Sequence, residues 1–165
     1  MCLDRVLRRC RRFLWQMSEA KQGIKYMKPE VLSTLLTTGD KSKFVVIDVR
    51  DSDFEGGNVL GAINLRDDTF DKNVGDYVTK YKGKEQVIFH CMKSQMRGPR
   101  CAEVFRKRLF KSLDSGCEVF ILEGGYSGWQ RYVFNQCKEN RSLLPKHIEN
   151  YDEDDWEARF EGFHS

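Results

Sequence analysis

VIFHCMKSQMRGPR, residues 87–100, decides the fold, because it joins a short apolar run to a helical pattern through a loop with one cysteine and one arginine. The β-branched and aromatic side chains at 87–89 are typical of a buried strand. Apolar side chains at 102, 104, 105 and 109, with charged residues between them, suit an amphipathic helix, and Gly98 and Pro99 stand near its start. The segment therefore predicts a strand, a tight loop and a helix, in that order.

Cys91 and Arg97 bracket this loop, with five residues between them. Free N–H groups at a helix N-terminus attract anions, and a guanidinium matches two oxygens of phosphate or arsenate. The same positive surroundings favour the thiolate of Cys91. Cys2 and Arg8 share the spacing but lie in a helical pattern. The prediction for Cys91 therefore rests on the strand before it and the helix after it, and not on the spacing alone. Cys91 is predicted to be a nucleophile that needs no general base.

Other strands surround the loop in the predicted fold. Residues 44–51 form an apolar run that ends in charge, as expected of a central parallel strand, and Asp48 and Arg50 are expected to pair structurally there. Residues 55–65 show a glycine-rich turn and a short strand, and residues 119–129 show a strand, a glycine turn and a helix start. Strands that alternate with helices predict a parallel α/β domain.

The blocks VIDVRDSDFEGGNVLGAINL (46–65), VIFHCMKSQMRGPRCA (87–102) and VFILEGGYSGW (119–129) resemble the rhodanese-fold domain of Cdc25-type phosphatases and eukaryotic arsenate reductases. The likeness covers roughly residues 23–134. It implies a rhodanese-like central parallel sheet of five strands with helices on both faces. Sulfurtransferases of this fold carry a shorter loop, whereas the loop from Cys91 to Arg97 has the length that suits a tetrahedral oxyanion.

The resemblance also implies roles for the loop. Cys91 would form a phosphocysteine or a thiol-arsenate adduct, and Arg97 would bind the oxyanion. His90 would order the loop as a structural residue, and the hydroxyl of Ser94 is a candidate donor to the thiolate or the leaving group. The oxyanion cradle would be completed by the backbone N–H groups of Met92, Lys93, Ser94, Gln95, Met96 and Arg97.

The chain departs from the cell-cycle Cdc25 pattern at several positions. Its loop holds no acidic residue, so a general acid is unassigned, and Glu123 after the last strand is a candidate whose simpler role is in a turn. Val49 stands where those relatives have a cysteine that protects the nucleophile, which excludes that disulfide. Asn58 replaces a histidine of the glycine-rich block.

Arsenate reduction requires a second thiol as reductant, whereas phosphate hydrolysis requires no cofactor. Cys101 could supply this thiol if its helix turned it toward the loop, although packing within the helix is its simpler role. External glutathione or glutaredoxin is the alternative that the resemblance implies. The expected partners are a phosphorylated protein or a small oxyanion, with glutaredoxin as a candidate reductant.

Composition agrees with one catalytic domain inside the cell, in the cytoplasm. A chain of 165 residues suits a single core, and its six cysteines form no C-x2-C pair and follow no secretory signal, so neither zinc nor a disulfide framework is expected. The net charge of +3 is too small to indicate nucleic acid as a partner. No apolar stretch approaches the length of a membrane span.

Two charged extensions flank the catalytic domain, which is expected at 23–137. Residues 1–22 have the pattern of a basic amphipathic helix, which could contact an anionic membrane surface, direct the chain to an organelle or pack on the domain. Residues 138–165 form an acidic tail whose run at 151–157 is typical of a solvated segment but could instead dock near the basic helix or the basic surface of the loop.

Two other functions stay open. A sulfurtransferase would carry a persulfide on Cys91, and transfer of sulfur from thiosulfate to cyanide would identify it. A catalytically silent interaction module of the same fold is the other alternative, because fold does not determine function. The presence of both Cys91 and Arg97 favours an enzyme.

Overall fold

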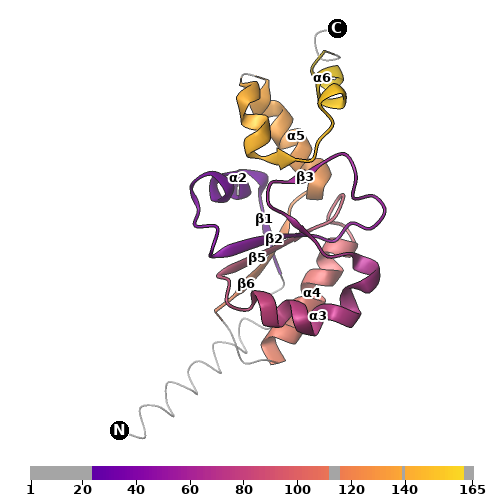
Figure 1. The fold of residues 1–165 in the computed structure, drawn as a ribbon. Coiled ribbons are helices and arrows are strands. Elements are labelled where there is room, and N and C mark those ends of the chain that lie inside the picture. Colours follow the sequence, from indigo (N-terminus) through magenta and orange to yellow (C-terminus); the bar gives the residue numbers. More distant parts are fainter. Residues whose placement is uncertain (1–23, 112–115, 139, 162–165) are drawn as a thin grey trace, which may run out of the picture.

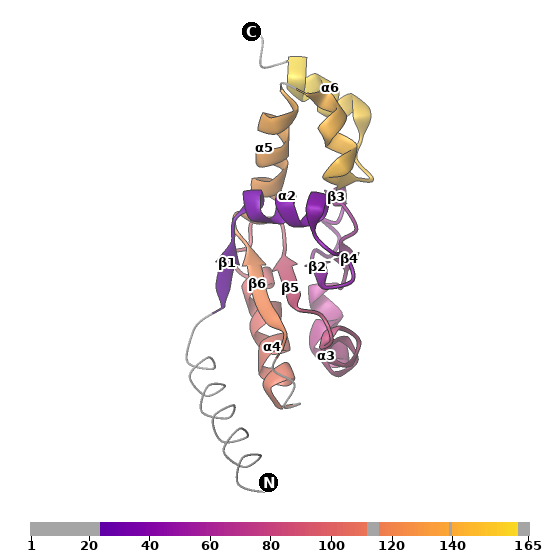
Figure 2. The ribbon, with the colours of Figure 1, turned by 90° about the vertical axis from the view of Figure 1, so that its left-hand side faces the viewer.

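A five-stranded parallel sheet forms the centre of the protein, in the strand order β1-β6-β5-β2-β4 (Figures 1 and 2). The structure is a computed structural model that describes residues 24–111, 116–138 and 140–161. The strands are β1 (Lys25–Met27), β2 (Phe44–Asp48), β4 (Ile63–Asn64), β5 (Gln86–His90) and β6 (Glu118–Leu122). The parallel sheet predicted from the sequence is confirmed.

The central strands β2 and β5 are buried because helices cover both faces of the sheet. Every residue of β2 is buried, and its partners in β5 follow in parallel register, with Val46 opposite Ile88 and Ile47 opposite Phe89. Successive side chains of a strand point to opposite faces. Val46 and Ile88 therefore enter one core, and Ile47 and Phe89 enter the other.

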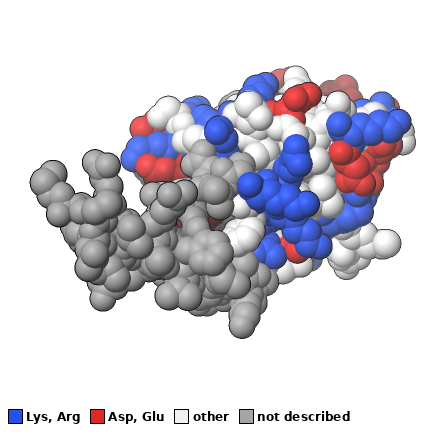
Figure 3. Space-filling view, turned by 90° about the horizontal axis from the view of Figure 1, so that it is seen from below, with Lys and Arg blue, Asp and Glu red and all other residues white. Residues whose placement is uncertain are grey.

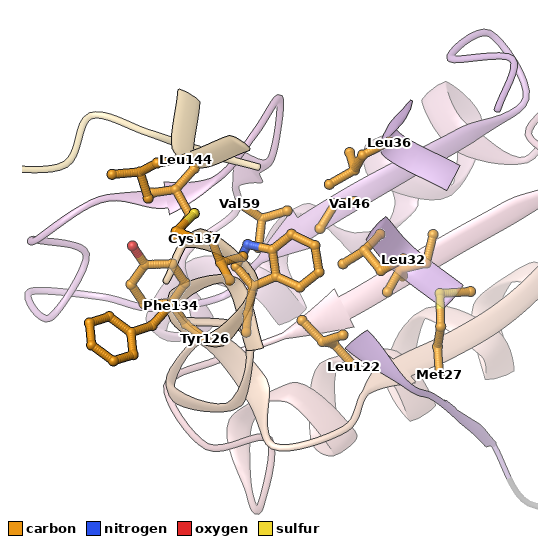
Figure 4. Packing of buried hydrophobic residues seen from close by; sticks show 14 of the residues in the cluster. Met27, Leu32, Leu36, Val46, Val59, Leu122, Tyr126, Phe134, Cys137 and Leu144 are labelled. Atoms are coloured by element: carbon orange, nitrogen blue, oxygen red, sulfur yellow. The ribbon is translucent and has the colours of Figure 1, made fainter. Parts of the chain in front are cut away.

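The helices lie in two layers. On one face, α2 (Pro29–Thr38) and α5 (Gly125–Cys137) pack around Trp129; on the other, α3 (Asp67–Tyr81) and α4 (Arg97–Lys111) pack around Phe105 (Figures 1 and 2). Figure 4 shows the first core, where the side chains of α2 meet those of the sheet and α5. The predicted helices on both faces are confirmed.

The C-terminal segment packs onto α5. It contains η1 (Arg141–Lys146), β7 (Ile148–Glu149) and α6 (Glu153–Glu161), and β7 pairs antiparallel with β3 (Asn58–Val59). Trp156 is 1% exposed and its ring centroid lies 6.3 Å from that of Phe134, while Ile148 is fully buried. The acidic side chains at 152–155 and 157 are exposed, as expected of a solvated run, but the burial of Trp156 holds the segment against the domain. Two large apolar side chains outweigh the acidic residues between them, because burying each contributes about 1.5–3 kcal/mol.

Basic side chains gather on one face of the molecule. Figure 3 shows a group of lysine and arginine residues on the face that lies at the bottom of Figure 1, toward which α4 runs. The last turn of α4 contains Arg108 and Lys111, where positive charge suits the helix dipole.

No helix in the described ranges is long and apolar enough to cross a membrane. The basic helix predicted at 1–22, with its three candidate roles, lies outside the residues that the structure describes.

Candidate active site

The loop between β5 and α4 lies at the carboxyl edge of the sheet. Cys91 follows directly after β5, residues 92–96 form the loop, and α4 begins at Arg97. The strand, loop and helix predicted at 87–100 are thus confirmed. Cys91 is buried, with 4% of its surface exposed.

The N-terminus of α5 clamps the first half of the loop. The backbone N–H of Tyr126 donates to the carbonyl of Cys91 at 2.9 Å, and that of Ser127 donates to the carbonyl of Met92 at 2.8 Å. Two loop carbonyls are thereby held against α5.

The amide groups of the loop have no such partners. Among the described residues, no oxygen accepts a hydrogen bond from the backbone N–H groups of residues 92–97. Ser94 takes a positive φ of 51°, and its hydroxyl is buried without a hydrogen-bond partner. Free backbone N–H groups at a helix N-terminus bind anions, so this run of free amides next to a thiol suits an anionic ligand. The residues predicted to form the cradle, from Met92 to Arg97, occur together in one loop.

Gly125 permits the close contact between α5 and the loop. It has a φ of +59°, and a Cβ there would lie 2.5 Å from the carbonyl oxygen of Cys91 and 2.7 Å from the amide nitrogen of Ser94. Both atoms belong to the backbone, so neither can move without displacing the loop.

We expect Gly125→Ala to lower the free energy of unfolding by about 2–4 kcal/mol, from the strained φ and the overpacking together. Urea unfolding measures this change. Gly83→Ala is the matched control, because nothing lies within 4 Å of a Cβ at Gly83. A Gly125 variant as stable as the Gly83 variant would contradict the tight contact.

Arg97 projects toward two aspartates that follow β2. Its Nη1 donates to Asp51 Oδ2 at 3.1 Å and to Asp53 Oδ1 at 2.7 Å, and its Nη2 donates to Asp53 Oδ2 at 2.5 Å. The guanidinium lowers the pKa of Asp53 to about 2, chiefly through these hydrogen bonds. In return, the hydrogen bonds to Asp53 raise the pKa of Arg97 above its ordinary value.

Sequence reasoning missed both aspartates as site residues. The available signal was their position directly after the central strand, because the carboxyl ends of parallel strands meet at one edge of the sheet. Asp51 and Asp53 therefore reach the same edge as the loop after β5.

Arg50 organises the segment that carries these aspartates. It is fully buried and pairs with Asp48, with its Nε 2.8 Å from Oδ2. Its other nitrogens donate to three carbonyls of the segment that follows, those of Asp53, Glu55 and Gly57. Its guanidinium also lies over the ring of Tyr126, 4.2 Å from the centroid. The structural pair predicted for Asp48 and Arg50 is confirmed.

His90 is fully buried behind the loop. Its Nδ1 lies 3.4 Å from the carbonyl oxygen of Cys91, and its Nε2 lies 3.7 Å from Asp48 Oδ2. Burial lowers the pKa of His90, so the ring is neutral at neutral pH. Both nitrogens thus face groups of the interior, an arrangement that fits the structural role expected from the sequence.

The other thiols and the candidate acid Glu123 lie outside the loop from Cys91 to Arg97. Cys101 is buried and its thiol donates to Asp67 Oδ1 at 3.1 Å; burial, with Asp67, raises its pKa well above the ordinary range. Cys137, the last residue of α5, is buried in the first core, and burial raises its pKa as well. Both thiols are therefore protonated and poor nucleophiles. Glu123 is exposed at the end of β6.

A parallel α/β sheet in which a cysteine and an arginine bracket the loop between a central strand and a helix defines a rhodanese-fold domain with a Cys-x5-Arg loop. Residues 29–132, more than half of the chain, match the model of the family described as Rhodanese-like domain. The chain belongs to this family, and its relatives place it with the Cdc25-type phosphatases and arsenate reductases.

Several relatives support that placement. The dual specificity phosphatase ibp1 of Schizosaccharomyces pombe is 32% identical over 127 residues, which cover 66% of this chain and 89% of the relative. Arsenate reductase 2.2 of Oryza sativa subsp. japonica is 30% identical over 112 residues, 66% of this chain and 84% of that protein. The solved structure of Ygr203w, a yeast protein tyrosine phosphatase of the rhodanese family, matches with a TM-score of 0.64 and 26% identity, over 82% of this chain and 98% of Ygr203w.

Proposed function

We propose that this protein is a cysteine-dependent enzyme that acts on tetrahedral oxyanions, as a Cdc25-like phosphatase, an arsenate reductase or both. The observation that carries the proposal is the run of unpaired backbone N–H groups at residues 92–97, between the thiol of Cys91 and the guanidinium of Arg97. Six amides and one arginine match the charge that three equatorial oxygens develop in a transition state.

In the phosphatase reaction, the thiolate of Cys91 attacks phosphorus, the S–P bond forms, and the bond to the leaving oxygen breaks. Water then hydrolyses the phosphocysteine, which releases inorganic phosphate and restores the thiol. The leaving oxygen must gain a proton. Asp53 cannot supply it in the free enzyme, because its pKa of about 2 leaves it ionised at neutral pH. Solvent is then the proton source, which favours substrates with good leaving groups.

In the arsenate reaction, Cys91 displaces one oxygen of arsenate as water and forms the S–As bond. Reduction of As(V) to As(III) then oxidises two thiols to one disulfide. Within the described residues, Cys101 and Cys137 are buried and protonated, so neither is suited to be the second thiol. Cys117 is partly exposed but precedes β6, at the opposite end of the strands from Cys91. Glutathione or glutaredoxin is therefore the proposed reductant, and the phosphatase reaction needs no cofactor.

Replacement of Arg97 tests the proposal. We expect Arg97→Lys to lower kcat/KM for a small aryl phosphate, and for arsenate with glutathione, by about 10²–10³-fold, because an ammonium cannot bind two oxygens in a fork. Arg100→Lys is the matched control. Arg100 is another arginine of α4 that pairs with two aspartates, Asp67 and Asp71, but it lies outside the Cys-x5-Arg loop.

Two outcomes would contradict the proposed function. A wild-type chain that neither hydrolyses aryl phosphate nor reduces arsenate, but moves sulfur from thiosulfate to cyanide through a persulfide on Cys91, is a sulfurtransferase. Inactivity in all three assays points to a binding module.

A further inference from the structure

The hydrogen bonds of Arg97 leave one edge of its guanidinium without a partner. A guanidinium has five N–H groups, two on each Nη and one on Nε. Both groups of Nη1 and one of Nη2 donate to Asp51 and Asp53. Nothing in the described ranges accepts from Nε. The Nε–H and the second Nη2–H lie side by side on the same edge, spaced for two oxygens of one anion.

We infer that Asp53, assisted by Asp51, is a positioning residue that grips the end of the Arg97 side chain and presents its Nε–Nη2 edge to the oxyanion. This inference rests on the proposed function and assigns residues that the Cys-x5-Arg pattern does not contain. Asp53 acts through Arg97 and takes no part in bond breaking.

The two aspartates are themselves held in place. The backbone N–H of Asp51 donates to Asp53 Oδ1 at 3.0 Å, and the N–H of Asp68, in the first turn of α3, donates to Asp51 Oδ1 at 3.2 Å. The buried Arg50 donates to the carbonyl of Asp53 at 3.2 Å. These hydrogen bonds fix the backbone of the segment that carries Asp51 and Asp53. A fixed segment holds the guanidinium of Arg97 within the narrow geometry that catalysis requires.

The opposite role would be competition for the same guanidinium. Asp51 and Asp53 together carry two negative charges beside the single positive charge of Arg97, and a dianionic substrate is repelled by the excess. Competition requires that the carboxylates occupy the edge that binds the oxyanion. Asp53 instead occupies the end formed by Nη1 and Nη2, so the other edge is left for the anion. The two roles predict changes of opposite sign when Asp53 loses its charge.

Asp53→Asn is the test. We expect the inhibition constant of inorganic phosphate to rise, and kcat/KM for an aryl phosphate to fall, by about 10–100-fold each, the scale of a misplaced binding group. Asp53→Glu, which keeps the charge, should restore part of the loss. The effect should be constant between about pH 5 and about pH 8, because a carboxyl with a pKa of about 2 is ionised throughout that range.

Asp71→Asn is the matched control. Asp71 also pairs with an arginine, with its Oδ1 2.9 Å from Arg100 Nη1, but it lies on the exposed side of α3. Its loss removes the same charge without releasing Arg97. We expect the inhibition constant of phosphate in this variant to stay within about twofold of the wild type, since most surface ion pairs have little effect.

A second measurement separates this inference from the proposed function. Protection of Cys91 by inorganic phosphate against iodoacetamide, followed at that residue by mass spectrometry, reports anion binding without turnover. A wild-type chain without aryl phosphate hydrolysis and without protection of Cys91 by phosphate would contradict the proposed function. An active, protected wild type with an Asp53→Asn variant that binds phosphate equally well or more tightly would overturn the positioning role alone.

Discussion

Cys91→Ser is expected to abolish both aryl phosphate hydrolysis and arsenate reduction, with kcat at least about 10³-fold below the wild type. A serine hydroxyl is a weak nucleophile unless a base removes its proton. No base is placed for this, because the ring nitrogens of His90 lie against the carbonyl of Cys91 and the carboxylate of Asp48. The assay is steady-state kinetics in reducing buffer, with trapping of the phosphocysteine in the wild type.

Cys117→Ser is the control for this substitution. Cys117 is the partly exposed thiol that precedes β6, at the opposite edge of the sheet from the loop. Its replacement should leave both activities unchanged. A Cys91→Ser variant that kept more than about one tenth of the wild-type kcat would show that the thiol is not the nucleophile.

Arg50→Met is expected to lower the free energy of unfolding by about 3–5 kcal/mol, because it leaves the fully buried Asp48 carboxylate without its partner. The same change removes the donor to three carbonyls that shape the segment before β3. Urea unfolding followed by tryptophan fluorescence measures the effect, since Trp129 and Trp156 are both buried.

The exposed pair of Arg66 and Asp68 provides the comparison. Both side chains are about half exposed, so Arg66→Met should change stability by at most about 1 kcal/mol. If Arg50→Met cost no more than Arg66→Met, the buried pair would not organise this edge of the sheet.

The fold and the ends of the site loop follow from local pattern. Buried parallel strands require apolar runs such as 44–48 and 86–90, and a helix that begins after a tight loop requires residues such as Gly98 and Pro99. These are preferences of short segments, so sequence alone predicts them. The pairing of Asp48 with Arg50 is equally local, because the two charged residues are only two positions apart at the end of one strand.

Other features depend on segments that are distant in sequence. Asp53 lies 44 residues from Arg97, and no local pattern indicates which charged side chain will meet that guanidinium. The acidic residues around Trp156 give no sign of its burial, which depends on contacts such as that with Phe134 on α5.

The sequence by itself determined a parallel α/β sheet and a Cys-x5-Arg loop between a strand and a helix, since apolar periodicity, turn residues and one motif are readable along the chain. The resemblance of three sequence blocks to a known family identified the sheet as rhodanese-like. Only the tertiary structure decided that α5 clamps the loop carbonyls, that Asp51 and Asp53 hold Arg97, and that Cys101 points at Asp67. The physical reason is that hydrogen bonds and ion pairs between different elements depend on how the sheet and its two helical layers pack, which no single segment encodes.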